Sequence, residues 1–369
     1  MNRAAKDFCA SSRSQPLIFI PFLLTAFLCL ASVAFSLGKH KDQNIYHAPV
    51  AYEPESNVHA SNATIVYLLT HDVYLEQFKV SFPLLEQNWL HRFPVGQVTI
   101  FFTDNVCFEM LKRAANTESV PVELVPVARR HPEYLSRFPS SQCKCCCNNG
   151  TARTLPGGSI FPGKEYDLDY CWMNRFRTLD MYQHDALRDF NYFVQLDTDL
   201  YVEKPLPYDP IKIMAMKGAV FGFKYSNIRG AVNDCNEGLH KAVDEYFTRS
   251  NVKRVYIPPL GAQYQGNFNI GDLNFLRSEN YLKFARFIND ELTGVYTSRW
   301  GDQLYLPLVI GAFFREEKLN IFSDLHDEGY LVHKSKSLGQ NLRKQNVECP
   351  SRSPTSKSAR RSLDIVLTA

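Results

Sequence analysis

The sequence carries little excess charge of either sign, and what it has is confined to its two ends. The 369 residues include 41 Lys and Arg against 38 Asp and Glu, a formal net charge of +3. Residues 1–16 and the stretch from Asn346 onward each contribute +2, which leaves the middle close to −1. The charged residues of these ends are Arg3, Lys6, Arg13 and Asp7, and then Arg352, Lys357, Arg360, Arg361, Glu348 and Asp364. So weakly charged a middle lacks the basic face of a nucleic-acid-binding protein, and we expect no nucleic-acid partner.

Long apolar runs are also missing, with one exception. LIFIPFLLTAFLCLASVAFSL, residues 17–37, has 21 residues and no charge. As a helix it would span roughly 30 Å, about one bilayer core. Basic residues before it and the lack of a second such run predict a signal anchor, with a cytosolic tail at 1–16 and a lumenal body. The alternative is a signal peptide cleaved near Ala34-Phe35-Ser36, although its apolar region is usually about 7–15 residues.

The cysteines lack the paired histidines of a zinc site, even at the cluster CKCCC (143–147). Cys9 and Cys29 fall in the tail and the apolar run. The other eight would lie in an oxidising lumen, where an even count favours disulfides over a metal site. They are Cys107, Cys143, Cys145, Cys146, Cys147, Cys171, Cys235 and Cys349. Glycosylation sequons at Asn62 and Asn149 suit the same compartment.

The rest of the chain alternates between apolar runs that end in polar residues and stretches with helical periodicity. Strands are expected at 64–72, 97–105, 192–196 and 219–225, helices at 74–90, 170–190, 239–250 and 274–291, and either element at 304–314. This alternation predicts an α/β fold with a mostly parallel sheet and with ligands at the carboxyl ends of the strands. The predicted lumenal domain covers residues 62–345 and contains a long inserted loop at 131–163. A polar stem at 38–61 precedes this domain, and a disordered tail at 346–369 follows it.

The stretch NYFVQLDTDLYVEKPLPYD (191–209) carries the chemistry most directly. An apolar strand ends in two carboxylates, Asp197 and Asp199. A nucleotide-sugar transferase needs such a pair, because a divalent cation held by carboxylates neutralises the leaving diphosphate. Oxygen ligands suit Mn²⁺ or Mg²⁺. An acidic pair on its own is also common as a turn cap, so further motifs have to support this interpretation.

Three blocks supply that support. YCWMNRFRTLDMYQHDALRDFNYFVQLDTDLYVEKPLPYDPIKIM (170–214), NFNIGDLNFLRSENYLKF (267–284) and SRWGDQLYLPL (298–308) resemble, in the same order, the signature regions of the yeast-type Golgi α-1,2-mannosyltransferases, glycosyltransferase family 15. The resemblance implies a GT-A-like nucleotide-sugar-binding fold behind one N-terminal transmembrane helix. It also implies a retaining enzyme of the Golgi membrane, single-pass type II, that moves mannose from GDP-mannose to mannose-containing glycans or glycoproteins. The alternatives are a transferase for a different donor, and a catalytically weak glycan-binding or scaffold protein.

The resemblance assigns roles residue by residue. Asp197 and Asp199 take the place of the family's acidic metal ligands, with Asp199 also at the donor. The metal site is completed by a histidine, for which His333 is the first choice and His326 the alternative. Arg175 and Tyr170 would lie at the donor site, and Asp302 would contact the acceptor sugar or assist its hydroxyl. For Asp302 a simple helix cap is the structural alternative.

One departure bears on the mechanism. The family's N-F-E-I segment has a glutamate, proposed as its nucleophile, where this chain has Asn269. An amide cannot form a glycosyl ester as a carboxylate does. Asp272 is the nearest acid that could replace it, and one step along a strand or helix would point it elsewhere. We therefore expect Asn269 to act in a reaction without a covalent intermediate.

Overall fold

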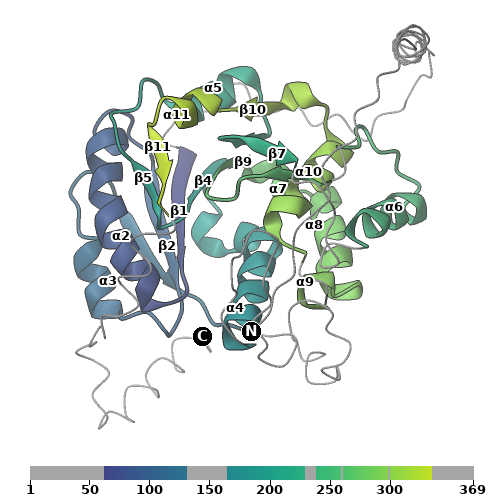
Figure 1. Ribbon diagram of the computed structural model, residues 1–369, viewed down its shortest axis with the longest axis horizontal. Coiled ribbons are helices and arrows are strands. Elements are labelled where there is room, and N and C mark those ends of the chain that lie inside the picture. Colours follow the sequence, from purple (N-terminus) through teal and green to yellow (C-terminus); the bar gives the residue numbers. More distant parts are fainter. Residues whose placement is uncertain (1–61, 131–163, 229–237, 259–260, 298–299, 335–369) are drawn as a thin grey trace, which may run out of the picture. The chain divides into compact units, whose positions relative to one another are not determined.

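A seven-stranded sheet forms the centre of the part of the chain that the computed structural model describes (Figure 1), namely residues 62–130, 164–228, 238–258, 261–297 and 300–334. The predicted tail, apolar run, stem, inserted loop and C-terminal tail lie outside these residues. Within them, no helix combines the length and the apolar character needed to cross a bilayer. The membrane anchor therefore stays a prediction.

The strands lie in the order β10-β6-β9-β4-β1-β2-β3. They are β1 (Ala63–Leu69), β2 (Gln97–Phe102), β3 (Val122–Pro126), β4 (Tyr192–Leu196), β6 (Phe221–Phe223), β9 (Phe268–Asp272) and β10 (Leu319–Ile321). The pairs β1–β2, β2–β3, β1–β4 and β6–β10 are parallel, while β9 runs antiparallel to both β4 and β6. The predicted mostly parallel sheet is confirmed.

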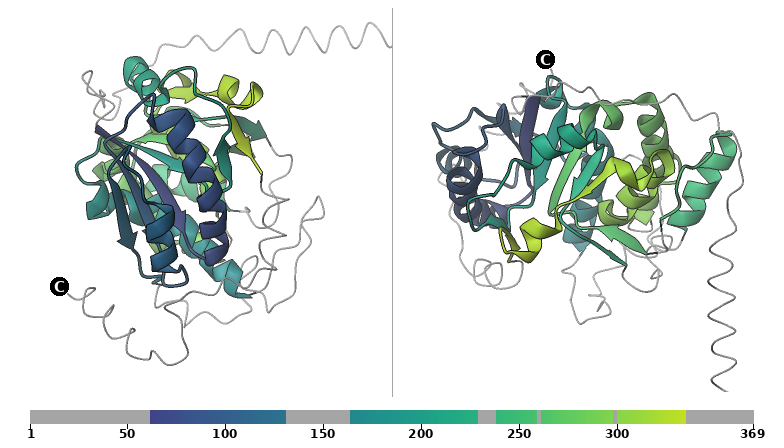
Figure 2. Two further views of the ribbon diagram at one scale, coloured as in Figure 1. Left: turned by 90° about the vertical axis from the view of Figure 1, so that its left-hand side faces the viewer. Right: turned by 90° about the horizontal axis from the view of Figure 1, so that it is seen from above.

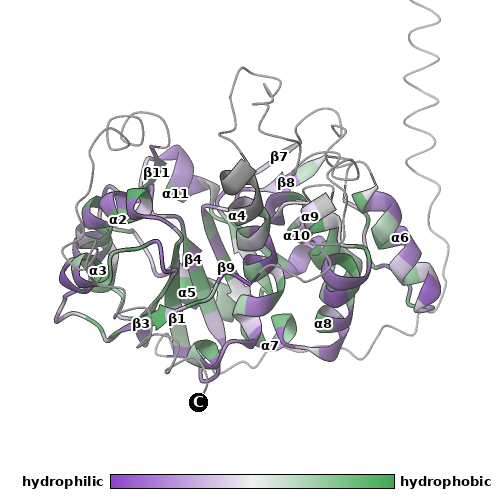
Figure 3. Cartoon of the chain, turned by 90° about the horizontal axis from the view of Figure 1, so that it is seen from below, coloured by the Kyte–Doolittle hydropathy of each residue, from purple (hydrophilic) through white to green (hydrophobic). Residues whose placement is uncertain are grey.

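Helices cover both faces of this sheet (Figure 2) because successive side chains of each strand point to opposite faces. On one face, α2 (Asp72–Leu85), α3 (Phe108–Ala114), α5 (Pro210–Lys217) and α11 (Ser323–Asp327) pack on residues such as Ile65, Val194 and Ile270. On the other, α4 (Lys164–Arg175), α6 (Leu239–Arg249), α8 (Glu279–Arg286) and α10 (Asp302–Phe313) pack on residues such as Val66, Phe193 and Phe221. In Figure 3 the central strands β1 and β4 are largely hydrophobic, whereas α6 and α8 carry both hydrophobic and hydrophilic residues.

The undecided stretch 304–314 is helical, as part of α10. Pro307 lies inside this helix, and nearly every apolar residue of the helix is buried. Its hydrophobic character on all sides explains why no periodicity was visible in the sequence. The two-stranded sheet of β5 (Leu200–Val202) and β11 (Leu331–His333) was not predicted, because each strand has three residues.

Two cysteines fall within the described residues. Cys107 is disulfide-bonded, as predicted for this cysteine. Cys171 was expected among the disulfide cysteines, and that expectation is wrong: it is a free thiol, fully buried in the core. A buried Cys behaves as a small apolar side chain, which suits its place on the inner face of α4. The Asn62 side chain is exposed, whereas Ala63 and Thr64 of the same sequon are buried in β1.

Candidate active site

Asp197 and Asp199 follow β4 at the carboxyl edge of the sheet. The chain leaves β1 in one direction to form β2 and β3 and then returns to place β4 on the other side of β1. Such a reversal of strand order opens a crevice at the carboxyl ends of the strands, where α/β proteins bind ligands. The acidic pair predicted from the sequence lies at this point.

The turn that carries the two aspartates is held by hydrogen bonds. The backbone N–H of Asp197 donates to the carbonyl of Asn267 (3.1 Å), and the N–H of Leu200 donates to the carbonyl of Asp197 (3.0 Å). Between the aspartates, the buried Thr198 hydroxyl donates to Gln77 Oε1 at 2.8 Å. Helix α2 and the residue before β9 thereby fix the backbone from which both carboxylates project.

His333 lies beside Asp199, with 3.2 Å between Nε2 and the carboxylate Oδ2. The antiparallel pairing of β5 with β11 brings them together, because it sets His333 opposite Leu200, the residue after Asp199. His326, the alternative ligand, instead stacks on the ring of Tyr225 with 4.5 Å between centroids. The structure thus brings together Asp199 and the histidine that was the first choice.

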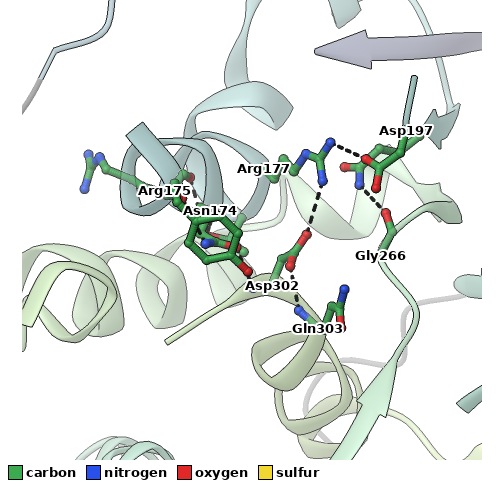
Figure 4. Close-up of polar contacts among 10 residues, drawn as sticks. Asn174, Arg175, Arg177, Asp197, Gly266, Asp302 and Gln303 are labelled. Atoms are coloured by element: carbon green, nitrogen blue, oxygen red, sulfur yellow. Dashed lines mark hydrogen bonds and ion pairs between the residues drawn. The ribbon is translucent and has the colours of Figure 1, made fainter. Parts of the chain in front are cut away.

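Arg177 bridges the acidic pair to Asp302 (Figure 4). Its Nη2 lies 2.5 Å from Asp197 Oδ1, and its Nη1 lies 3.7 Å from Asp302 Oδ2. Burial acts to lower the pKa of Arg177, but Asp197 and Asp302 outweigh it and raise the pKa above the usual value. This buried guanidinium therefore stays charged and joins the two predicted carboxylates into one cluster.

Asp302 is the buried end of this cluster and stands in the first turn of α10. Burial raises the pKa of Asp302, while the neighbouring Arg177 opposes the shift. One carboxylate oxygen accepts a hydrogen bond from the N–H of Gln303 at 2.8 Å, and the N–H of Asp302 donates to Asn174 Oδ1 at 3.0 Å. Asp302 thus partly caps its helix, and its other oxygen faces Arg177.

Tyr170 is half-buried near the start of α10. A methyl group added at Gly301 would lie 3.6 Å from both the Tyr170 hydroxyl and Asn174 Oδ1. Tyr170 also makes a small contribution to the raised pKa of Arg177. The structure therefore places Tyr170 on the Asp302 side of the cluster.

Arg175 lies apart from this cluster. Its guanidinium forms ion pairs with Asp180 at 3.3 Å and with Asp290, and in Figure 4 it points away from Asp302. The sequence analysis named Arg175 and missed Arg177, which stands two residues later in the same R-F-R segment. Two residues turn a helix by roughly 200°, so the two arginines project from opposite sides.

Asn269 lies on β9 between Gln195 and Phe223 in the register of the sheet. It is buried, and its Oδ1 has no hydrogen-bond partner among the described residues. Asp272 stands at the opposite end of β9, about 10 Å away along the strand, and caps α7 (Leu273–Leu276) by accepting a hydrogen bond from Asn274 at 2.8 Å. The structure separates Asp272 from the acidic pair.

A divalent metal would find a carboxylate and an imidazole at this edge. Asp199 and His333 offer one oxygen and one nitrogen ligand close together, a set that suits Mn²⁺. Asp197 is already engaged by Arg177, and within the described ranges no three His, Cys, Asp or Glu side chains cluster closely enough to hold a metal. The residues fit a metal with two protein ligands whose remaining positions are filled by water or by a ligand's oxygens.

Comparisons with known proteins give a family and a fold. The family model described as "Glycolipid 2-alpha-mannosyltransferase" matches residues 32–354. The probable mannosyltransferase YUR1 of Saccharomyces cerevisiae is 25% identical over 191 residues, which cover 46% of this chain and 44% of that protein. The chain thus spans less than half the length of this and other curated relatives.

Two solved structures share the fold. Core-mannan synthase A (CmsA/Ktr4) from Aspergillus fumigatus, in its Mn/GDP form, matches with a TM-score of 0.58 and 19% identity, over 76% of this chain and 82% of that one. The mannosyltransferase Ktr4p from S. cerevisiae in complex with GDP matches with a TM-score of 0.57 and 20% identity, over 80% of this chain and 78% of that one. The predicted α/β, GT-A-like fold is confirmed.

Proposed function

The chain belongs to the glycolipid 2-alpha-mannosyltransferase family, and from that membership we propose that it is a retaining glycosyltransferase that moves mannose from GDP-mannose to a mannose-containing glycan. The observation that carries the proposal is the cluster at the carboxyl edge of the sheet. There Asp199 lies beside His333, and Asp197 is joined to the buried Asp302 through Arg177. We assign the donor to the acidic edge and the acceptor to the side of the buried Asp302.

Asp199 and His333 would hold the divalent cation, Mn²⁺ or Mg²⁺. The imidazole nitrogen favours Mn²⁺, since Mg²⁺ strongly prefers oxygen. When bound, the cation offsets the negative charge of the leaving diphosphate. Asp197 would position the site through Arg177 rather than bind the metal directly, because Arg177 already occupies its Oδ1.

The transfer proposed here is a front-face reaction. The bond from the sugar's C1 to the diphosphate oxygen breaks, and the acceptor hydroxyl oxygen bonds to C1 from the same side. The hydroxyl proton passes to the leaving diphosphate oxygen, so no protein nucleophile is needed. Asn269 supports this route, because its buried Oδ1, which has no partner among the described residues, can accept a hydrogen bond from a sugar hydroxyl. Asp302 would accept a hydrogen bond from the acceptor sugar and orient it.

A glycan-binding or scaffold protein is the second candidate. Two observations favour it. This chain has the amide of Asn269 where the family has a glutamate, and Asp197 is engaged by Arg177. In such a protein the same side chains would bind nucleotide or glycan without turnover. Binding of GDP without transfer would be its signature.

A Golgi membrane location as a single-pass type II protein is also part of the proposal. The uncharged run at 17–37, the exposed side chain of Asn62 in a sequon and the disulfide at Cys107 support it. A protein that stays in the membrane through carbonate extraction and carries glycans would support this placement. A soluble secreted product that begins near Leu37 would contradict it.

The test of function is a panel of nucleotide sugars offered to the purified full-length protein in detergent, with mannose-terminated oligosaccharides as acceptors. We expect turnover with GDP-mannose, retention of configuration in the product, and loss of turnover in chelator. Turnover with another donor would identify the related transferase. GDP binding without any turnover would identify the scaffold protein.

A further inference from the structure

Lys224 is the residue that follows β6, and it lies at the same edge of the sheet as Asp197. The last residues of β6 and β4 pair with Asn269 and Phe268, on the two sides of β9. Because β4 and β6 both run antiparallel to β9, both strands end beside its start. Asp197 and Lys224 are the next residues, so their backbones flank the same strand, roughly 10 Å apart at two strand spacings.

The Lys224 side chain is buried without an acceptor. Its exposed fraction is 0%, and Nζ donates no hydrogen bond to any described residue. Its Nζ lies 5.4 Å from the centroid of the Tyr225 ring. An ammonium group has three N–H donors, and leaving them unmet away from water costs free energy. Such a group is expected where a ligand supplies the acceptors.

Charge at this edge indicates what kind of ligand fits. Burial lowers the pKa of Lys224 to about 8, while Asp197 and Asp199 act in the opposite direction, so both aspartates are near the ammonium. Their carboxylates nevertheless interact with other groups, Asp197 with Arg177 and Asp199 with His333. An anion that enters beside the aspartates therefore needs a cation that is not yet paired.

We propose that Lys224 is a binding residue for the diphosphate of the nucleotide-sugar donor, to whose oxygens its ammonium donates hydrogen bonds. The proposal rests on the function proposed above and adds a residue that neither the family resemblance nor the acidic pair identified. The four-carbon stem allows the ammonium to advance toward a ligand while the backbone stays in place. The opposing interpretation is that Lys224 only offsets the charge of Asp197 and Asp199.

The experiment measures binding by calorimetry with the full-length protein in detergent and Mn²⁺, using GDP, guanosine and inorganic pyrophosphate as probes. Lys224→Met removes the charge and keeps the stem. We expect it to weaken GDP and pyrophosphate binding on the order of 10-fold or more, as for a lost hydrogen bond to a charged group, and to leave guanosine binding unchanged. Lys212→Met, at an exposed lysine on α5, is the matched control and should bind all three like the wild type.

The outcomes separate this proposal from the proposed function. A wild type that binds GDP while Lys224→Met binds it equally well overturns the role of Lys224 alone. If the wild type binds pyrophosphate but not GDP, the proposal that the donor carries a guanine nucleotide is overturned. In that case, loss of pyrophosphate binding in Lys224→Met still supports a role of Lys224 in binding the diphosphate. Equal weakening of guanosine and GDP would show a structural role and overturn the proposal. Lys224→Gln tests the same expectation if the Met variant does not fold.

Discussion

Arg177 Nη2 lies 2.5 Å from Asp197 Oδ1, and the same guanidinium also faces the buried Asp302. A buried cation between two carboxylates is stable as a unit but costly to break, since removal of one member leaves charge without compensation. The contacts of Arg177 therefore affect both the stability of the fold and the positions of the carboxylates in the candidate site.

Arg177→Met should both destabilise the protein and remove activity. The loss of a buried charge partner typically costs about 3–5 kcal/mol, and mispositioned carboxylates should lower turnover on the order of 10²-fold. Urea unfolding and donor turnover measure the two effects. Arg175→Met is the matched control, because its partners Asp180 and Asp290 have side chains that are 38% and 45% exposed. A larger loss in Arg175→Met than in Arg177→Met would contradict this account.

His333→Gln should raise the Mn²⁺ concentration needed for half-maximal turnover by about 10-fold or more, because one of two protein ligands is lost. His326→Gln, which removes only a ring stacked on Tyr225, should leave that concentration nearly unchanged. Asp199→Ala should lose most turnover at any metal concentration. Full activity in chelator, or a stronger effect of His326→Gln than of His333→Gln, would show that the metal assignment is wrong.

Stability should fall as the pH drops below 6.5 because of His184. Burial lowers the pKa of His184 below its ordinary value of 6.5, and its Nδ1 accepts a hydrogen bond from Ala186 N at 3.2 Å. At pH values between the pKa of His184 in the folded protein and 6.5, this histidine binds more protons in the unfolded chain than in the folded protein. The free energy of unfolding therefore decreases with falling pH in this range. His184→Asn keeps an acceptor at this cap and does not titrate. Urea unfolding at pH 7.5 and 5.5 should show a larger loss in the wild type; equal losses would exclude this role for His184.

The sequence predicted the acidic pair and four strands of the central sheet, β1, β2, β4 and β6, because these depend on local pattern, whereas β3, β9 and β10 were not predicted. A buried strand such as β4 is a continuous apolar run, and the carboxylates that end it follow directly in the chain. The resemblance to a known family added Asp302 and His333, which no local pattern would have joined to Asp197. These parts of the site were predictable from the chain alone.

The rest depends on contacts between distant segments. His333 reaches Asp199 through a pairing of two three-residue strands more than a hundred positions apart, too short to show any periodicity. Whether Arg177 or Arg175 contacts Asp197 and Asp302 depends on which side of α4 and of the helical turn after it faces the sheet. In the sequence Lys224 is an ordinary lysine near the end of the strand predicted at 219–225, and its burial follows from the packing around it. Packing of this kind cannot be deduced from spacing.

Asn269 provides the last test, because it separates the two retaining mechanisms. In the front-face route Asn269 only hydrogen-bonds the sugar, so Asn269→Ala should keep a reduced but measurable rate and the product should retain configuration. Asp272→Ala should stay active as well, since that carboxylate caps α7 at the far end of β9. The measurement is product configuration by NMR with single-turnover rates for each variant. A sugar trapped covalently on Asp272 would overturn the front-face mechanism. An inert wild type in which Asn269→Glu gains activity would instead identify a scaffold protein that keeps the fold of its catalytic relatives.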